Sequence, residues 1–309
     1  DNMASFLGID TSNYTTSVAL VEEGRVSANL KKSVYVAEKE RGVRQSDALF
    51  CHVKNLPVLM EELGKLPELT AVGYSARPRD MEGSYMPCFL AGELLGRSIG
   101  AGRGVPVYAF SHQAGHIQAA LYSAGVLEWQ ERPFLAFHVS GGTTELLLCE
   151  KGEIRKIGGT ADLTAGQAID RTGVRLGLRF PCGAELEKLA EGVKPAKARP
   201  SVRGLTCHIS GLENQTVKMM EEGRSKEEIA AYTIEFIRAT LEALTANALE
   251  LYGRMPVLYA GGVMSCRIIR ESMEKKFAGA FAQPEFSSDN ACGTALLCEK
   301  AFRKEKEKK

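Results

Sequence analysis

Residues 6–20 read FLGIDTSNYTTSVAL, and residues 134–148 read FLAFHVSGGTTELLL. At this offset of 128 positions, six of the fifteen aligned residues are identical. Each copy is an apolar run of strand length, a break of small polar residues and a second apolar run that begins with Thr, which is the pattern of a β-hairpin. The repeat predicts two lobes of similar topology that each open on a hairpin, and a chance match of two hairpins is the alternative.

The segments around these hairpins alternate between strand and helix patterns. We predict further strands over residues 69–76, 106–110 and 256–263, and helices over residues 55–66, 89–102, 111–123 and 225–253. This alternation is typical of an α/β protein. We therefore expect an N-terminal lobe over residues 3–132, a C-terminal lobe over residues 133–289, and a final helix over about 290–303 that packs back on the first lobe.

Length and composition agree with a two-lobed globular protein. The chain has 309 residues, and its apolar fraction of 44% excludes global disorder. A formal net charge of +1 gives the whole chain no attraction to phosphate backbones, so a nucleic-acid partner would need a local basic patch. Without a membrane-length apolar stretch, a secretory signal or a CxxC motif, we expect a cytoplasmic protein with no membrane contact and mostly buried free thiols.

His112 and His116 are candidate metal ligands. They are four residues apart on the predicted helix over 111–123, which places both imidazoles on one helical face. Hydrogen bonds from both rings to the backbone are the alternative. Because Gln113 follows the first histidine, the motif lacks the glutamate that acts as general base in HExxH proteases. Asp289, before the final helix, could be a third ligand or simply the cap of that helix.

Two glycine pairs are candidate ligand-binding loops. The SGGTT segment, Ser140–Thr144, forms the turn of the second hairpin, where glycines allow the backbone to approach a phosphate. Gly261 and Gly262 end a predicted buried strand, and ligands of open α/β sheets bind just outside such strand ends. A plain turn is the alternative for both. Because the sequence has no GxxxxGK[ST] motif, a P-loop is excluded.

Two aspartates and a further glycine extend this candidate site. Asp162 and Asp170 are predicted to lie about two turns apart on one face of a helix, where an aspartate can hold a ribose hydroxyl or a magnesium ion. Surface solvation is the alternative. Gly183 precedes the next helix, and its closeness in sequence to Asp170 predicts a shared ligand wall.

The ordered motifs GIDTS, SHQAGH, VSGGTTELL, AGQAID, RFPCGAELEKLA, YAGGV and SSDNA resemble those of the TsaD/Gcp/Kae family, formerly called O-sialoglycoprotein endopeptidase. The resemblance covers nearly the whole chain. It implies the duplicated actin/hexokinase/Hsp70-like fold, which is an ASKHA or RNase H-like α/β fold with a cleft between two lobes. It also implies a transferase that moves threonylcarbamoyl from threonylcarbamoyl-adenylate to N6 of the tRNA adenosine beside the anticodon. Accessory proteins of that pathway would be further partners.

The resemblance also implies roles for individual residues. One divalent metal, iron or zinc with magnesium as an alternative, would be bound by His112, His116 and Asp289. ATP or an acyl-adenylate would be bound by residues on its phosphate, ribose and adenosine sides, namely Ser140, Gly141, Gly142, Thr143, Thr144, Asp170, Gly183, Gly261, Gly262 and Cys266. No catalytic residue is assigned.

The chain departs from the family pattern at several positions. The family's TSCDET is TSNYTT at residues 11–16, without either acid, and its PGLxG turn is PRDMEG at residues 78–83. Ala114 and Gln167 replace glutamates, and Cys266 replaces an asparagine that contacts the nucleotide. We therefore expect a divergent paralogue that keeps the metal and an adenine nucleotide and has an altered substrate.

Three other functions compete with this interpretation. The lost acids favour a non-catalytic partner protein of the same fold. A small-molecule kinase of the same superfamily would need an acidic base near the phosphoryl acceptor, and it would leave His112 and His116 unexplained. A metalloprotease follows only from the older family name and lacks the required glutamate.

Overall fold

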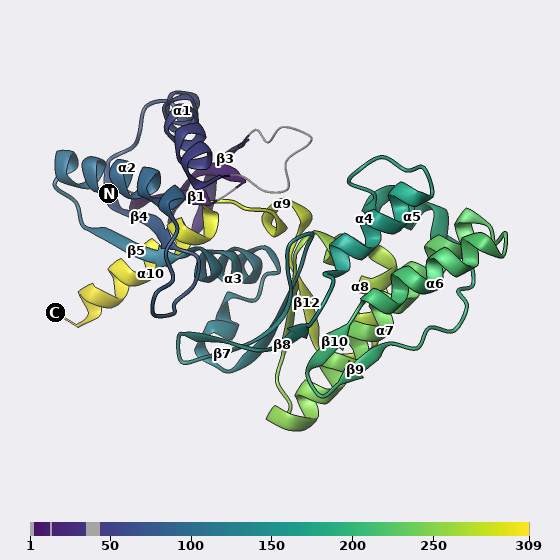
Figure 1. Cartoon of the computed structure of the whole chain (residues 1–309). Coiled ribbons are helices and arrows are strands. Elements are labelled where there is room, and N and C mark those ends of the chain that lie inside the picture. Colours follow the sequence, from purple (N-terminus) through teal and green to yellow (C-terminus); the bar gives the residue numbers. More distant parts are fainter. Residues whose placement is uncertain (1–2, 13, 35–43, 309) are drawn as a thin grey trace. The chain divides into compact units, whose positions relative to one another are not determined.

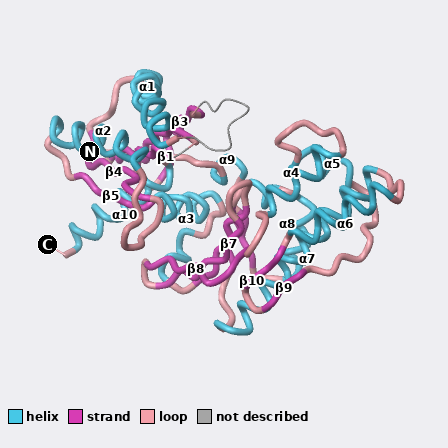
Figure 2. Tube along the Cα trace, in the orientation of Figure 1, coloured by secondary structure: helices cyan, strands magenta, loops and turns pink. Residues whose placement is uncertain are grey.

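The computed structural model of the protein describes residues 3–12, 14–34 and 44–308. The chain divides into two compact units, of which the first combines Asp1–Tyr122 with Glu285–Lys309 and the second is Ser123–Pro284. Each unit is a sheet with helices packed on it (Figure 1 and Figure 2).

The first observed boundary lies between residues 122 and 123, ten residues before the expected one at 132/133. The second lies between residues 284 and 285, five residues before the expected one at 289/290. Local contacts explain both differences. The ring of Trp129 packs against Phe134 of the second unit, with centroids 6.4 Å apart. The Lys31 ammonium of the first unit donates to the Glu285 carbonyl and the Ser288 hydroxyl, at 3.0 and 2.8 Å.

The first unit has a five-stranded sheet in the order β3-β2-β1-β4-β5, with β1 to β3 antiparallel and β4 and β5 parallel to β1. Its strands are β1 (Ser5–Ser12), β2 (Thr15–Glu22), β3 (Arg25–Ser33), β4 (Leu69–Arg77) and β5 (Val107–Ser111). Its helices are α1 (Gln45–Leu63), α2 (Leu90–Arg103), α3 (His112–Ser123), α9 (Pro284–Ser287), α10 (Cys292–Glu307) and a 3₁₀ turn, Pro87–Phe89.

Strand β1 is buried along its whole length because helices cover both faces of this sheet. Leu7 and Ile9 point into a core with α1 and α2, whereas Phe6 points into a second core with α10. Successive side chains of a strand alternate between faces, so a central strand covered on both sides is apolar throughout. This explains why residues 5–9 form an almost continuous apolar run.

The second unit has a seven-stranded sheet in the order β12-β11-β6-β7-β8-β10-β9. Its strands are β6 (Phe134–Val139), β7 (Thr144–Glu150), β8 (Glu153–Thr160), β9 (Ser201–Arg203), β10 (Thr206–His208), β11 (Val257–Ala260) and β12 (Gly279–Phe281). Its helices are α4 (Ala165–Arg175), α5 (Gly183–Ala190), α6 (Ser210–Glu221), α7 (Lys226–Tyr252), α8 (Arg267–Lys276) and two 3₁₀ turns, Leu127–Glu131 and Gly262–Ser265. One core joins β6 and β7 to these helices.

The sequence repeat corresponds to a structural repeat. In the first hairpin Leu7 lies opposite Leu20, and in the second Leu135 lies opposite Leu148, so the same pairing recurs at the offset of 128. Thr11 lies opposite Thr16 in β1–β2, and the equivalent Val139 lies opposite Thr144 in β6–β7. The predicted pair of hairpins is therefore confirmed, each inside its own sheet.

Most predicted elements are present, and two helices are longer than predicted. Helix α1 begins at Gln45 rather than at residue 55. The prediction missed its first turns because the polar His52 on the buried face and Pro57 inside the helix obscure the apolar periodicity. Helix α10 continues to Glu307 rather than ending near 303. The predicted start of α7 is confirmed, since Ser225 caps it.

Two expectations about chemistry and environment can be compared with the fold. All eight cysteines are free thiols, and six of them are buried, as predicted. None of the helices in the described part of the chain combines the length and apolar composition needed to span a bilayer.

Candidate metal and nucleotide sites

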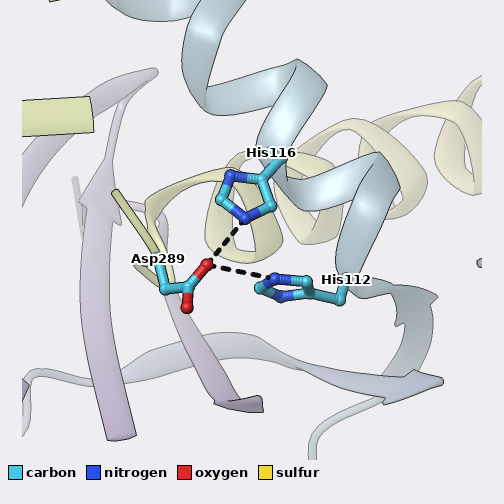
Figure 3. Close-up of side chains that lie close together, drawn as sticks. All are labelled: His112, His116 and Asp289. Atoms are coloured by element: carbon cyan, nitrogen blue, oxygen red, sulfur yellow. Dashed lines mark hydrogen bonds and ion pairs between the residues drawn. The ribbon is translucent and has the colours of Figure 1, made fainter. Parts of the chain in front are cut away.

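Helix α3 presents two histidines side by side in the first unit. His112 is the first residue of the helix, directly after β5, and His116 follows one turn later. Their ring centroids are 4.4 Å apart and the rings are nearly perpendicular. Figure 3 shows both rings turned toward Asp289, as the i, i+4 spacing predicts for side chains on one helical face.

Asp289 reaches the histidines because α10 crosses very close to α3. A Cβ at Gly293 would overlap the carbonyl oxygen of Gly115, so the crossing requires glycine at position 293. Oδ1 of Asp289 lies 2.8 Å from Nε2 of His116 and 3.2 Å from Nε2 of His112 (Figure 3). The three donor atoms all lie within 4.8 Å of one another.

The alternative role of Asp289 as a helix cap does not apply. Helix α10 has Ala291 at its N-cap position, and the side-chain oxygen of Asn290 accepts a hydrogen bond from the Cys292 N–H at 3.1 Å. The Asp289 carboxylate therefore faces the imidazoles instead of the helix backbone.

Asp10 is a fourth member of this cluster that the sequence analysis did not identify. Its Oδ2 lies 2.6 Å from Nδ1 of His112, and the same oxygen accepts the Ser75 hydroxyl at 2.5 Å. Its Oδ1 accepts the Ser12 N–H at 3.0 Å, and the residue is 1% exposed. An aspartate in the otherwise apolar run FLGID was the available signal, because buried carboxylates need partners.

The charges in the cluster favour a cation at its centre. Burial alone would raise the pKa of Asp289, but hydrogen bonds from His112 and His116 hold it well below its usual value. Burial alone would lower the pKa of His112, yet the carboxylates of Asp10 and Asp289 hold that pKa well above its usual value. Two carboxylates beside one imidazole concentrate negative charge at this place, which favours a bound cation.

The donor set fits one divalent metal. Two imidazole nitrogens and one carboxylate oxygen are ordinary ligands of zinc and iron, and they leave a coordination position open. Nδ1 of His112 is taken by Asp10, which leaves Nε2 as the nitrogen that faces the other two donors. A carboxylate on the far nitrogen of a metal-bound histidine is a common supporting contact.

The SGGTT segment of the second unit is a turn anchored to the start of α4. The Ser140 N–H donates to the Thr143 carbonyl at 2.7 Å, and the Thr164 hydroxyl donates to the Gly141 carbonyl at 2.8 Å. The Thr144 hydroxyl accepts the Ala165 N–H at 2.9 Å. Gly141 and Gly142 are exposed, so their backbone is accessible to a ligand.

The second glycine pair lies at the same edge of the sheet. Strands β6 and β11 are parallel neighbours, with Ala260 opposite His138, so the segments that follow them are adjacent. Gly261 has φ +104°, and a Cβ there would overlap the carbonyl oxygen of Val139. Only glycine fits this position. The structure thus brings the two predicted loops together, where ligands of open α/β sheets bind.

Asp170 and Gly183 are also adjacent. Oδ1 of Asp170 on α4 accepts the Cys182 N–H at 2.8 Å, and Gly183 is the first residue of α5. Cys266 precedes α8, and burial raises its thiol pKa to about 11, so the thiol stays neutral.

The prediction that Asp162 shares a helical face with Asp170 is wrong. Thr164 caps α4, which starts only at Ala165. The Asp162 carboxylate instead accepts the N–H groups of Ile209 and Ser210, at 2.7 and 3.2 Å, where α6 begins. The short segment before Thr164 carried no periodicity that could have shown this.

Several residues that depart from the family pattern have local structural partners. Gln167 forms the capping box of α4 with Thr164. Asp80, in the altered 78–83 turn, accepts Arg77 and the Ser111 hydroxyl beside His112. Asn13, in the altered hairpin, lies outside the described residues.

Comparison with known proteins identifies the family to which the chain belongs. A family model for tRNA N6-adenosine threonylcarbamoyltransferase matches residues 13–296. The chain belongs to this family. It is 34% identical to the family member of Thermus thermophilus over 94% of this chain and 90% of that protein. It is 29% identical to the member of Methanopyrus kandleri, over 92% of this chain and 84% of the relative.

Solved structures of distant proteins share the fold. HypF of T. kodakarensis matches 98% of this chain and 48% of its own, with a TM-score of 0.65 and 12% identity. A glucokinase of the ROK family from Streptomyces griseus matches 96% of this chain and 100% of its own, with a TM-score of 0.54 and 14% identity. These matches confirm the duplicated α/β fold of the actin/hexokinase type that the family resemblance implied.

Proposed function

We propose that the protein is a metal-dependent transferase that moves a threonylcarbamoyl-type group from an acyl-adenylate to N6 of a tRNA adenosine. The main support is that ligand atoms of His112, His116 and Asp289 lie within 4.8 Å of one another, in a chain of the threonylcarbamoyltransferase family. The cytoplasm is the proposed location, and accessory proteins of the same pathway are the proposed partners.

In this proposal the first unit holds the metal. Nε2 of His112, Nε2 of His116 and a carboxylate oxygen of Asp289 would be its ligands, with iron or zinc as the metal. A bound divalent ion acts as a Lewis acid that polarises a carbonyl oxygen. Asp10 fixes the orientation of the His112 ring through Nδ1, and Ser75 and the Ser12 N–H fix Asp10 in turn.

The second unit would hold the adenylate. The exposed backbone of Gly141 and Gly142 can approach phosphate oxygens. Gly261 lets its segment lie against the end of β6, and the space beside Gly262 is open. Asp170 and Gly183 are proposed to bind near the ribose, and the neutral Cys266 near the adenosine. Residues that fix the donor in this way lower the barrier by removing translational and rotational freedom before the reaction.

We further propose that the preferred transferred group differs from the family's usual one, with threonylcarbamoyl-adenylate as a related donor and tRNA as the acceptor. The first hairpin lacks both acids of the family pattern. The 78–83 turn is tied through Asp80 to Ser111, the last residue of β5, directly before His112. Both changes lie in the unit that carries the histidine pair. Neither alters the three proposed ligands.

The decisive experiment combines metal analysis with a transfer assay. Protein purified without chelator should carry about one iron or zinc per chain. His112→Ala should lose the metal, whereas His208→Ala, at an exposed histidine outside the cluster, should keep it. Incubation with threonylcarbamoyl-adenylate and unmodified tRNA should yield modified adenosine, detected by mass spectrometry of the digested nucleosides. Equally low metal in wild type and His112→Ala would refute the metal site.

Nucleotide binding is measured separately by calorimetric titration with ATP and AMP. Heat of binding that is lost in a variant of the SGGTT segment supports the proposed adenylate site. Retained metal without binding of either nucleotide would favour the non-catalytic partner protein instead.

A further inference from the structure

One stretch of the second unit concentrates positive charge. Residues 192–212 contain no acidic residue and four cations, which we call the basic strip: Lys194, Lys197, Arg199 and Arg203. The chain as a whole carries +1, so the sequence outside the basic strip carries a net −3. Charge is therefore distributed unevenly in a chain that is nearly neutral overall.

The cations of the basic strip are exposed and uncompensated. All four side chains belong to exposed residues, and none forms an ion pair with another described residue. Acids of the neighbouring helices have their own partners, since Glu213 binds Arg171 and Arg175, and Glu228 binds Arg224. Glu222, which lines a pocket together with Lys197 and Arg199, is paired with Lys218. The positive charge of the strip therefore remains available to an external anion.

The backbone of the basic strip is held in place. Pro195 and Pro200 restrict the chain on either side of Ala198, which is buried and packs into the core. Arg203 ends β9, the edge strand, where it lies opposite Thr206 of β10. Little conformational entropy would be lost on binding, because the segment is already ordered.

Part of the basic strip borders a pocket. Lys197, Arg199 and Ser201 line a pocket of about 410 Å³ together with Gly211 and Gln215 of α6. The pocket also contains Glu222, whose carboxylate lies 3.8 Å from the Lys218 ammonium. The lining also includes Arg224 and the apolar or aromatic Met219, Tyr232 and Phe236. A nucleotide, which joins a phosphate to a flat base, suits such a mixed lining.

The extent of the basic strip argues for a polyanion. The four cations are spread over ten residues, from Lys194 in the irregular segment to Arg203 at the end of β9. A single small anion could engage only part of it, whereas successive phosphates of a nucleic acid could engage all four cations. We propose that the basic strip binds the phosphate backbone of the tRNA acceptor, an inference that rests on the proposed function.

The test measures tRNA affinity against salt with the full chain. The affinity for unmodified tRNA with adenosine beside the anticodon is measured by fluorescence anisotropy at salt concentrations from about 50 to about 400 mM. Phosphate contacts weaken over this range. The strip variant is Lys194→Gln/Lys197→Gln/Arg199→Gln. Its matched control is Arg155→Gln/Arg254→Gln/Lys275→Gln, which removes the same charge at exposed positions elsewhere in the same unit.

We expect the strip variant to lose about 2 units from the slope of log K against log salt, since each lost phosphate contact removes about 0.7–0.9. Its affinity near 0.1 M salt should fall at least about 30-fold. The control should stay within about 3-fold of wild type and keep the wild-type slope, and Arg203→Gln alone should lower the slope by about 1.

Four results would overturn the inference, and the first three concern binding alone. The first is an unchanged slope of log K against log salt in the strip variant. The second is an equal loss of tRNA affinity in the control variant. The third is no tRNA binding by the wild type at the lowest salt concentration, about 50 mM. Aggregation of the strip variant with unchanged tRNA affinity would also refute it, and would show that these cations only protect the edge strand. Wild type that binds tRNA through the strip but transfers no group would refute the proposed function and leave the strip assignment intact.

Discussion

At the scale of single residues, the candidate metal site depends on how His112 is held. One ring nitrogen faces Asp10 at 2.6 Å and the other faces Asp289 at 3.2 Å, so the imidazole bridges two carboxylates. Asp10 does not face the three-atom donor set itself. Its contribution is to fix the ring orientation and to leave Nε2 as the ligand nitrogen.

Replacing Asp10 with asparagine should therefore weaken metal binding without removing a ligand. An amide can still accept the Nδ1 proton, but it lacks the negative charge, and we expect affinity to fall about 10–100-fold. The measurement is competition for zinc against a chelator of known affinity. Ser75→Ala, which keeps the carboxylate and removes one of its hydrogen bonds, should cause a smaller loss. Wild-type affinity in Asp10→Asn would show that the contact is incidental.

At the scale of elements, glycines set two close approaches on which the sites depend. Gly293 lets α10 cross α3, and Gly261 lets the segment after β11 lie against the end of β6. Neither requirement can be read from a single sequence, because a glycine in a turn or helix has the same letter whether or not something packs against it. The sequence analysis singled out Gly261 only by its place after a buried strand.

Gly261→Ala and Gly262→Ala form a matched pair for testing this constraint. Alanine at 261 must adopt a positive φ and also meets the Val139 carbonyl, so we expect a loss of at least about 2 kcal/mol in the free energy of unfolding. A Cβ at 262 meets nothing within 4 Å, and its effect should stay within about 0.5 kcal/mol. Urea denaturation followed by circular dichroism measures both. Equal stabilities would contradict the proposed constraint.

At the scale of the whole molecule, the candidate sites fall in different units. The His112–His116–Asp289 cluster lies in the first unit, which is built from both ends of the chain, whereas the glycine pairs and Asp170 lie in the continuous second unit. Each unit has cores of its own, and the large core of the second unit draws only on residues between 135 and 281.

The fragment Ser123–Pro284 should therefore fold alone. We expect cooperative thermal unfolding, heat of binding with ATP and no bound metal, because every proposed metal ligand lies outside the fragment. Calorimetry and elemental analysis check these outcomes. Non-cooperative unfolding would show that the second unit depends on the first, and bound metal at one per chain would contradict the site assignment.

The sequence alone determined the duplicated α/β architecture and the grouping of the two histidines. The architecture follows from a hairpin motif that recurs 128 residues later, and the same strand pairing recurs with it. The histidines are grouped because the i, i+4 spacing places them on one face of a helix. Asp289 and the glycine loops were candidates from the residues themselves, and the family motifs added their implied roles in metal and adenylate binding.

Tertiary structure decided what depends on long-range contacts. Asp10 is 102 residues from His112, and Asp162 caps a helix 47 residues away, so neither role has a local sequence signal. The cations of the basic strip can be read from the sequence, but only the structure shows that they are exposed and have no described ionic partner. Local periodicity specifies elements, but packing between distant segments decides which polar groups meet and which stay available.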